Sequence, residues 1–306
     1  MSLTTLLAPK GKNGFGMSST AEQVSEGLNL SGQTWLVTGC NSGLGLETAR
    51  VLALRGATVI GAARTEDKAR EALTPIGGRT FPVACELSDP ASVRAAVAAV
   101  KAQVGPLHGI IANAGIMALP KVERKYGYEL QFFTNHVGHF MLVTGLLDHL
   151  GPTGRVVMLS SAAHTRTYAE GIRLDDLGAE RGYTAWGAYG QSKLANLLFT
   201  RELAKRLPAG QTANAVHPGV IATNLSRHMA APVQVLWNSV ASWLFLKDVA
   251  QGAATQVYVA VNPGASSITG EYWSDCNVAR STPHGEDMAL AAALWKKTEE
   301  IVASLP

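Results

Sequence analysis

The sequence predicts an α/β protein with a doubly wound, mostly parallel, seven-stranded sheet and helices on both faces. Three observations lead to this prediction. Short β-branched runs alternate with longer segments in which apolar residues recur every three or four positions. The connections between most successive strands are long enough to hold a helix, as parallel pairing requires. A glycine-rich turn separates the first strand from the first helix.

The expected strands are residues 35–38, 57–61, 80–85, 109–113, 155–160 and 212–217. The expected helices are residues 44–55, 89–104, 125–150 and 190–207. No linker rich in Pro, Gly or Ser divides the chain, and no internal repeat is visible. We therefore expect a polar, extended N-terminal arm over residues 1–30 and a single domain over residues 31–306.

Composition and charge exclude several classes of protein. Of the 306 residues, 47% are hydrophobic and 16% are charged, which is typical of a globular chain. The net charge of +3, without a long basic run, argues against nucleic acid as a partner. Three cysteines far apart, with no CxxC pair, predict neither a disulfide framework nor a structural metal site. The N-terminus lacks a secretory signal and residues 232–246 are too mixed to span a bilayer, so we expect a soluble cytoplasmic protein.

The glycine-rich turn lies in the run TWLVTGCNSGLGLETAR, residues 34–50. Glycine tolerates positive φ and has no Cβ, so it allows both a sharp turn and the close approach of a ligand. The free N–H groups at the start of the next helix, together with the helix dipole, favour a phosphate. The spacing TGxxxGxG between a strand and a helix favours a dinucleotide site of the Rossmann fold over an ordinary turn. The cofactor-binding residues expected here are Gly39, Asn41, Ser42, Gly43, Leu44 and Gly45.

Arg64 stands at the end of the second expected strand, ATVIGAAR. An acidic residue near this position usually holds the ribose 2′-hydroxyl of NAD, whereas an arginine can pair with the 2′-phosphate of NADP. Glu66 and Asp67 follow, but they lie beyond the strand end. Arg64 therefore favours NADP(H) over NAD(H); the alternative is a solvated surface charge.

A tyrosine and a lysine lie four residues apart in AYGQSKLANLLFTRELAKRL, so Tyr189 and Lys193 share one face of an expected helix. A phenol has an ordinary pKa of about 10. A nearby cation lowers that pKa toward a range that suits general acid–base catalysis. The alternative is an amphipathic helix with a surface lysine. Ser161, at the end of the strand RVVMLSS, can hydrogen-bond a carbonyl oxygen as the charge on that oxygen changes, and its alternative role is a helix or turn cap. Ser160 is the competing candidate.

Together these motifs resemble those of the short-chain dehydrogenase/reductase family. The matching segments occur in the family's order across nearly the whole chain: TGCNSGLG (38–45), ANAG (112–115), TNHVGHF (134–140), LSS (159–161), YGQSK (189–193) and HPGVIAT (217–223). Within the family, the chain looks most similar to the retinol dehydrogenases, the WW-domain oxidoreductase and the plant chloroplast-envelope members.

The resemblance implies that the domain is catalytic and transfers a hydride between NAD(P)H and a carbonyl compound or alcohol. It implies Tyr189 as general acid/base and Lys193 as tuning cation and ribose ligand. It further implies Ser161 as substrate orienter and Asn135 as the residue that holds a water in the proton path. Many members have an adenine-contacting aspartate where this chain has Glu86. The further cofactor contacts that the resemblance implies are Glu86, Leu87, Asn113, Ala114, Gly115, Pro218, Gly219, Val220 and Thr223.

A substrate lid is expected around residues 224–248, where the family covers its substrate. This stretch has an apolar stripe at helical spacing, formed by Val233, Leu236, Trp237, Val240 and Leu244. A small lipophilic carbonyl compound or alcohol is therefore the expected partner. Rival roles for the stripe are contact with a membrane surface, for which the dense Lys/Arg face is missing, and a subunit interface. The expected state is a dimer or tetramer, or a monomer.

Two histidines and one cysteine are interpreted as structural. His136 and His139 have a spacing that suits a metal, but no carboxylate or third histidine accompanies them, so no metal is expected. Cys40, in the glycine turn, is expected to be a small filler.

The function predicted from the sequence is an NADPH-dependent oxidoreductase that interconverts a lipophilic carbonyl compound and its alcohol. The alternative from another class is a dinucleotide-binding module that senses redox state or binds a protein. A sugar-nucleotide epimerase or dehydratase ranks below both, because those enzymes usually have a different glycine spacing.

Overall fold

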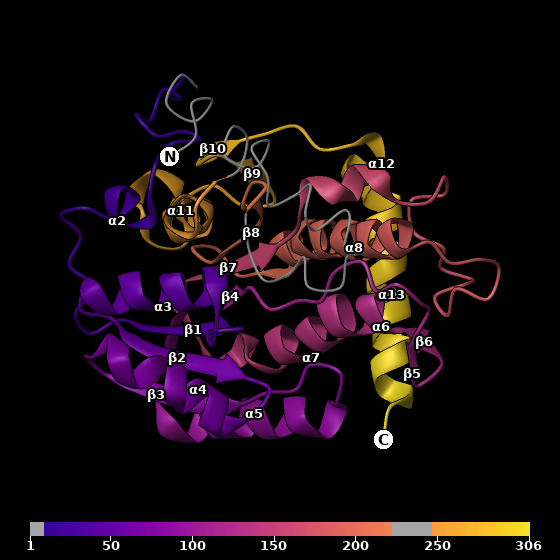
Figure 1. Cartoon of the computed structure of the whole chain (residues 1–306), viewed down its shortest axis with the longest axis horizontal. Coiled ribbons are helices and arrows are strands. Elements are labelled where there is room, and N and C mark those ends of the chain that lie inside the picture. Colours follow the sequence, from indigo (N-terminus) through magenta and orange to yellow (C-terminus); the bar gives the residue numbers. More distant parts are fainter. Residues whose placement is uncertain (1–8, 222–246) are drawn as a thin grey trace.

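The computed structural model describes residues 9–221 and 247–306. Within these residues, a sheet of eight strands crosses the molecule in the order β10-β9-β8-β7-β4-β1-β2-β3 (Figure 1). The strands are β1 (Thr34–Thr38), β2 (Thr58–Ala63), β3 (Thr80–Ala84), β4 (Leu107–Ala112), β7 (Leu150–Leu159), β8 (Thr212–His217), β9 (Tyr272–Ser274) and β10 (Asn277–Val278). All are parallel except β10. The strand order reverses between β1 and β4, the place where doubly wound sheets bind ligands.

The doubly wound, mostly parallel sheet is confirmed, but the predicted count of seven strands is wrong. The eighth strand of the described part, β10, is two residues long and returns antiparallel to β9. Asp275 and Cys276 make this return, with φ of 52° and 62°. A two-residue strand is too short to leave an alternating pattern in the sequence.

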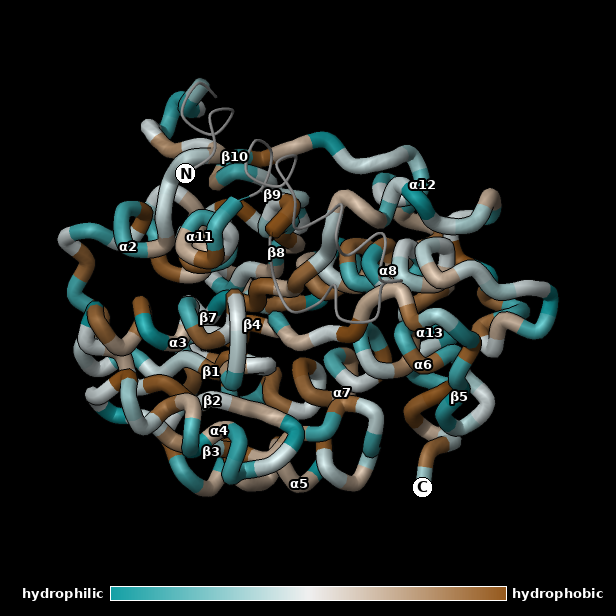
Figure 2. The backbone as a smooth tube through the Cα atoms, in the orientation of Figure 1, coloured by the Kyte–Doolittle hydropathy of each residue, from teal (hydrophilic) through white to brown (hydrophobic). Residues whose placement is uncertain are grey.

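Helices cover both faces of the sheet. The faces are visible in β1, where the side chains of Trp35 and Val37 join one core cluster and Leu36 joins the other. The first cluster is closed by α3 (Gly43–Leu54) and α11 (Val249–Val261), and the second by α5 (Pro90–Gln103), α7 (Gly138–Gly145) and α8 (Ala185–Arg206). Figure 2 shows the hydrophobic stretches on the strands and on these helices. Further helices are α2 (Ala21–Val24), α4 (Glu66–Leu73), α6 (Leu130–Phe132), α12 (Pro283–Glu286) and α13 (Met288–Ser304).

The helix expected over residues 125–150 is broken into several elements. A small hairpin of β5 (Arg124–Lys125) and β6 (Tyr128–Glu129) comes first, and its turn uses positive φ at Tyr126 and Gly127. The Glu129 side chain then accepts a hydrogen bond from the Phe132 N–H and caps α6. A π-helical turn, Phe133–Val137, separates α6 from α7. Apolar residues recur at helical spacing across this stretch, so the sequence predicted neither the hairpin turn at Tyr126 and Gly127 nor the π-helical turn.

Helix α8 also begins earlier than expected, at Ala185 instead of residue 190. The Thr184 hydroxyl accepts a hydrogen bond from the Gly187 N–H at 3.1 Å and sets this start. The extra turn includes Trp186, whose ring lies edge-on to the ring of Tyr189.

The N-terminal residues differ from the extended arm that was expected. From residue 9 onward they pack on the domain, and Ala21 and Val24 of α2 are buried against α11. Asn262 Nδ2 donates to Val24 O at 2.9 Å, and Phe15 packs edge-on against Tyr258. Because polar residues separate the few side chains of this segment that are buried, the sequence did not predict that the segment packs on the domain. Over residues 9–221 and 247–306, none of the helices combines the length and apolarity needed to cross a bilayer.

Candidate active site

The glycine turn between β1 and α3 has the geometry that the motif predicts. Gly39 and Gly43 have φ of 69° and 54°. A Cβ on Gly45 would lie 2.2 Å from Gly39 O and 2.6 Å from Asn113 Nδ2. Within the described residues, the Ser42 side chain makes no capping hydrogen bond, so the first N–H groups of α3 are available to an anion. Asn41 and Ser42 are exposed beside them, and Leu44 is buried beneath.

Replacing Gly45 by alanine is expected to damage this turn. The new methyl group would meet backbone, so the free energy of unfolding should fall by about 1–3 kcal/mol. Binding of the dinucleotide should weaken by roughly tenfold or more, since about 1.4 kcal/mol is a factor of ten. Gly105→Ala is the matched control, because a Cβ there meets nothing within 4 Å. Chemical denaturation and calorimetric titration measure both effects; equal behaviour of the two variants would contradict the prediction.

The loop after β4 is held beside the glycine turn by one threonine. Thr38 Oγ1 accepts from the N–H groups of Asn113 and Ala114 at 2.9 and 3.0 Å. Asn113 Nδ2 donates back to Thr38 O at 2.8 Å. Asn113 therefore braces the turn with its side chain, while Gly115 is exposed at the site. Sequence reasoning assigned Thr38 no role, although it begins the TGxxxGxG motif.

Arg64 directly follows β2 and is exposed at the carboxyl edge of the sheet. Thr65 caps α4 through the Lys68 N–H, and Glu66 pairs with Arg70 one turn further along. Glu66, the acidic residue nearest to Arg64 in the sequence, therefore pairs with Arg70 along α4. This leaves the Arg64 guanidinium able to meet a 2′-phosphate.

Glu86 and Leu87 follow β3 and lie in different environments, since Glu86 is partly exposed and Leu87 is buried. Glu86 Oε1 accepts from both the backbone and the hydroxyl of Ser88, at 3.0 and 2.9 Å. Leu87 is buried beneath α7, where a Cβ on Gly138 would lie 2.2 Å from Leu87 O. One carboxylate oxygen of Glu86 is therefore already occupied, and contact of Glu86 with adenine stays a prediction.

Cys40 is buried in the glycine turn, and its Sγ lies 2.8 Å from where a Cβ on Gly61 would stand. Burial raises the pKa of its thiol to about 12. A neutral, enclosed thiol acts as packing and not as a nucleophile.

The catalytic candidates meet where β7 ends against α8. Tyr189 is 8% exposed, and the Ser161 side chain lies close enough to its phenol to lower the phenol pKa. Lys193 is buried one turn further on, with Nζ 5.6 Å from the centre of the Tyr189 ring and donating to Leu159 O at 3.1 Å. The competing serine, Ser160, is buried and donates to Lys193 O at 2.8 Å. The structure therefore brings Ser161, and not Ser160, to the phenol.

The pKa of Tyr189 differs from what the sequence suggested. Burial raises it to about 12, and the nearby Ser161 side chain offsets this rise only in part. Burial also lowers the pKa of Lys193 to about 8. Desolvation of the phenolate therefore outweighs the stabilisation that the Lys193 ammonium gives it, and the phenol pKa is not depressed as the sequence predicted. At neutral pH the pair is a protonated phenol beside an ammonium ion.

Asn135 connects the loop after β4 to α8. Its Oδ1 accepts from the Ile116 N–H at 2.8 Å, and its Nδ2 donates to Ile116 O at 2.9 Å and to Ser192 Oγ at 3.0 Å. A Cβ on Gly115 would lie 3.1 Å from Asn135 Oδ1 and 3.5 Å from Lys193 Nζ. The side chain thus lies beside Lys193 and makes three hydrogen bonds to protein. Its role in holding a water stays a prediction.

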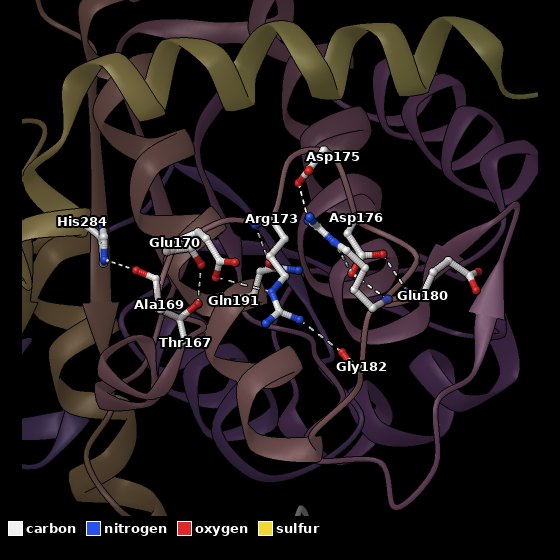
Figure 3. A network of polar contacts seen from close by, with 12 residues as sticks. Thr167, Ala169, Glu170, Arg173, Asp175, Asp176, Glu180, Gly182, Gln191 and His284 are labelled. Carbon is white, nitrogen blue, oxygen red and sulfur yellow. Dashed lines mark hydrogen bonds and ion pairs between the residues drawn. The ribbon is translucent and has the colours of Figure 1, made fainter.

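A long segment, residues 167–184, separates the Ser161 turn from α8 and is fixed by a polar network (Figure 3). Gln191 Oε1 in α8 accepts from the Arg173 N–H at 2.9 Å, and His284 of α12 contacts Ala169 O at 3.1 Å. Asp176 accepts from the N–H groups of Glu180 and Arg181 and closes the segment's turn. The network therefore holds the start of α8, which carries Tyr189, against its neighbours.

The residues after β8 reach the same edge. His217 Nδ1 accepts from the N–H groups of Ala162 and Gly219, at 3.2 and 3.4 Å, and so joins this loop to the Ser161 turn. Pro218 and Gly219 are half-buried and Val220 is exposed. Thr223 lies outside the described residues, as does the expected lid at 224–248 except for its last two residues. Sequence reasoning did not assign His217 this linking role.

Comparisons of the sequence with known proteins find relatives among the dehydrogenases. The family model for short chain dehydrogenases matches residues 33–173. Short-chain dehydrogenase TIC 32 B, chloroplastic, of Brassica napus is 42% identical over 311 residues, 97% of each chain. Human retinol dehydrogenase 14 is 37% identical over 300 residues, 90% of this chain and 88% of its own.

Two solved structures show the same architecture. A putative uncharacterized protein from Mycobacterium paratuberculosis matches with a TM-score of 0.75 and 34% identity, over 92% of this chain and 97% of its own. A short chain dehydrogenase from Burkholderia cenocepacia in complex with NADP matches with a TM-score of 0.63 and 26% identity, over 80% of this chain and 96% of its own.

The fold, the glycine turn and the Ser–Tyr–Lys cluster define an oxidoreductase built on a dinucleotide-binding sheet. The chain belongs to the short-chain dehydrogenase/reductase family, which confirms the family predicted from its motifs.

Proposed function

We propose that this enzyme interconverts a lipophilic aldehyde or ketone and its alcohol with NADP(H), with Tyr189 as general acid/base. The observation that carries the proposal is the Tyr189 phenol, which lies beside the Ser161 side chain and one helical turn from Lys193. These groups lie at the carboxyl edge of the sheet, beside the strand-order reversal.

The chain's own groups suit carbonyl reduction at neutral pH. When bound, the cofactor supplies the hydride. Ser161 donates a hydrogen bond to the carbonyl oxygen as negative charge builds there. Tyr189 gives its proton to that oxygen, and its raised pKa keeps the phenol protonated until then. The Lys193 ammonium stabilises the phenolate that remains.

The preference for NADP(H) is supported by Arg64 and by the solved relative that is in complex with NADP. Replacing Arg64 by aspartate is expected to raise KM for NADPH by roughly 10–100-fold, because a hydrogen bond to a charged group contributes about 1.5–3 kcal/mol. KM for NADH should fall or stay unchanged. Arg79→Asp is the matched control, since Arg79 is an exposed arginine before β3, at the opposite edge of the sheet. A wild-type enzyme that prefers NADH would show that the role assigned to Arg64 is wrong.

The lipophilic substrate is supported by the apolar stripe of the expected lid and by a relative. Human retinol dehydrogenase 14 carries in its name retinol, a lipophilic alcohol. A panel of aldehydes and ketones of increasing apolar surface, assayed with NADPH and with NADH, tests the proposal. We expect kcat/KM to rise with apolar surface. Activity confined to small polar carbonyls would contradict the substrate class.

Tight NADPH binding without turnover of any carbonyl compound or alcohol would instead favour the binding-module alternative. The cytoplasmic location and the oligomeric state stay predictions of the sequence.

A further inference from the structure

His139, in α7, is fully buried and uses both ring nitrogens. Its Nε2 lies 2.9 Å from Thr38 Oγ1, at the end of β1. Its Nδ1 lies 2.9 Å from Asn135 O, in the π-helical turn. The ring therefore connects the strand that ends in the glycine turn to the residue that contacts α8.

The partners of Thr38 determine the tautomer of this ring. The Thr38 hydroxyl oxygen already accepts two N–H groups, from Asn113 and Ala114. Its one proton must then go to His139 Nε2, so Nε2 is an acceptor and the ring proton is on Nδ1. Nδ1 in turn donates to Asn135 O. Burial lowers the pKa of His139 to about 4, so the ring keeps this neutral form at physiological pH.

The contacts continue from Asn135 to the catalytic tyrosine. Asn135 Nδ2 donates to Ser192 Oγ at 3.0 Å, and Ser192 Oγ donates to Tyr189 O at 2.8 Å. A series of hydrogen bonds, joined at Asn135 by the covalent bonds between its backbone carbonyl and its side-chain amide, thus runs from the loop after β4, through Thr38 and His139, to the backbone of α8 at Tyr189.

We propose that His139 is a positioning residue that couples the cofactor-binding loop after β4 to the catalytic helix α8. The proposal rests on the proposed NADP(H) function and adds a residue that touches neither cofactor nor substrate. Through Thr38 the ring fixes Asn113 and Ala114, which brace the glycine turn. Through Asn135 it fixes the backbone that carries Tyr189 and Lys193.

His136, one turn earlier, provides a matched control. It is as deeply buried as His139, but its Nε2 contacts Thr298 Oγ1 of α13 at 3.0 Å. Its ring packs against the aromatic rings of Phe132, Phe140 and Phe199. A change there disturbs the core without touching the series of hydrogen bonds from Thr38 to Tyr189.

The test compares the dissociation constant of NADPH with the melting temperature in purified full-length variants. His139→Phe keeps a ring but loses both contacts, and His136→Phe is its control. His139→Gln can place an acceptor as many bonds from Cβ as Nε2 and keep the Thr38 contact. His139→Asn can place a donor as many bonds from Cβ as Nδ1 and keep only the Asn135 contact.

We expect His139→Phe to raise the Kd for NADPH by roughly tenfold, which is about 1.4 kcal/mol. His136→Phe should change that Kd less than about twofold at a similar loss of melting temperature. His139→Gln should bind NADPH close to the wild type, with a lower kcat, whereas His139→Asn should bind more weakly.

The coupling is overturned if His139→Phe and His136→Phe change the Kd equally. Should His139→Phe fail to fold, the Gln and Asn variants decide, and equal Kd values for these two overturn it. Because Kd needs no substrate, a wild-type enzyme that binds NADPH but reduces no carbonyl compound contradicts the proposed activity and leaves this comparison valid.

Discussion

Tyr189→Phe is expected to lower turnover by about 10²–10⁴-fold, the usual contribution of general acid–base catalysis, and to leave cofactor binding intact. The substitution removes the phenolic oxygen and with it the proton that the reduced carbonyl oxygen needs. The ring itself stays, so the buried site is still filled and the edge-on contact with Trp186, at 6.1 Å between ring centres, is retained. Steady-state rates with NADPH and the best carbonyl substrate measure the loss, and calorimetric titration measures the NADPH affinity.

Tyr258→Phe is the control for this result. Tyr258 is also buried, but it lies in α11 against Phe15 and Trp273, away from Ser161. Its variant should turn over substrate within about twofold of the wild type. If Tyr189→Phe kept wild-type turnover, the phenol would not be the proton donor, and the proposed chemistry would have to be abandoned.

The parts of this enzyme that were predictable from sequence are those that depend on local rules. The glycine turn, the strand before it and the Tyr–Lys spacing on α8 each follow from backbone freedom or helical period. Ser161 could be preferred to Ser160 because strand alternation places them on opposite sides. The hairpin before α6 was missed because its turn, at Tyr126 and Gly127, lies within a run of helical period.

The properties that sequence reasoning missed depend on burial and on contacts between distant segments. A nearby lysine suggests a lowered phenol pKa, yet the depth at which Tyr189 lies raises that pKa instead. His139 was interpreted correctly as a satisfied helix histidine, but its partners lie 101 residues away at Thr38 and one turn back at Asn135. No spacing rule predicts the contact with Thr38, because it depends on how the fold brings α7 to the end of β1.

Lys193→Met is expected to reduce turnover by about 10²-fold or more and, at the same time, to make the cofactor-free protein more stable at pH 7. Catalysis suffers because the phenolate left after proton transfer loses its neighbouring positive charge. Stability rises because a buried ammonium ion is replaced by an apolar side chain of similar length. Little is lost with the ammonium, since Leu159 O still accepts from Asn196 Nδ2 at 2.9 Å.

The size and pH dependence of this gain follow from the lowered pKa. Lys193 has a pKa of about 8 when folded and 10.5 ordinarily. At about 1.36 kcal/mol per unit, the buried charge destabilises the folded wild type by roughly 3 kcal/mol below pH 8. Between pH 8 and 10.5 the folded state has lost this proton while the unfolded state keeps it, so wild-type stability rises with pH. The advantage of Lys193→Met should therefore shrink across this window.

Chemical denaturation of the wild type and of Lys193→Met between pH 7 and pH 10 measures this change in stability. In that range the buried phenol of Tyr189 does not yet contribute. Above pH 10 the raised pKa of Tyr189 acts with the opposite sign, because the folded state keeps a proton that the unfolded state loses. Lys205→Met, an exposed lysine on the same helix, is the control and should follow the wild type at every pH. A Lys193→Met protein that is less stable than the wild type at pH 7 would mean that the ammonium stabilises the fold. In that case lysine at this position would be explained by structure, and not by the charge that the phenolate needs.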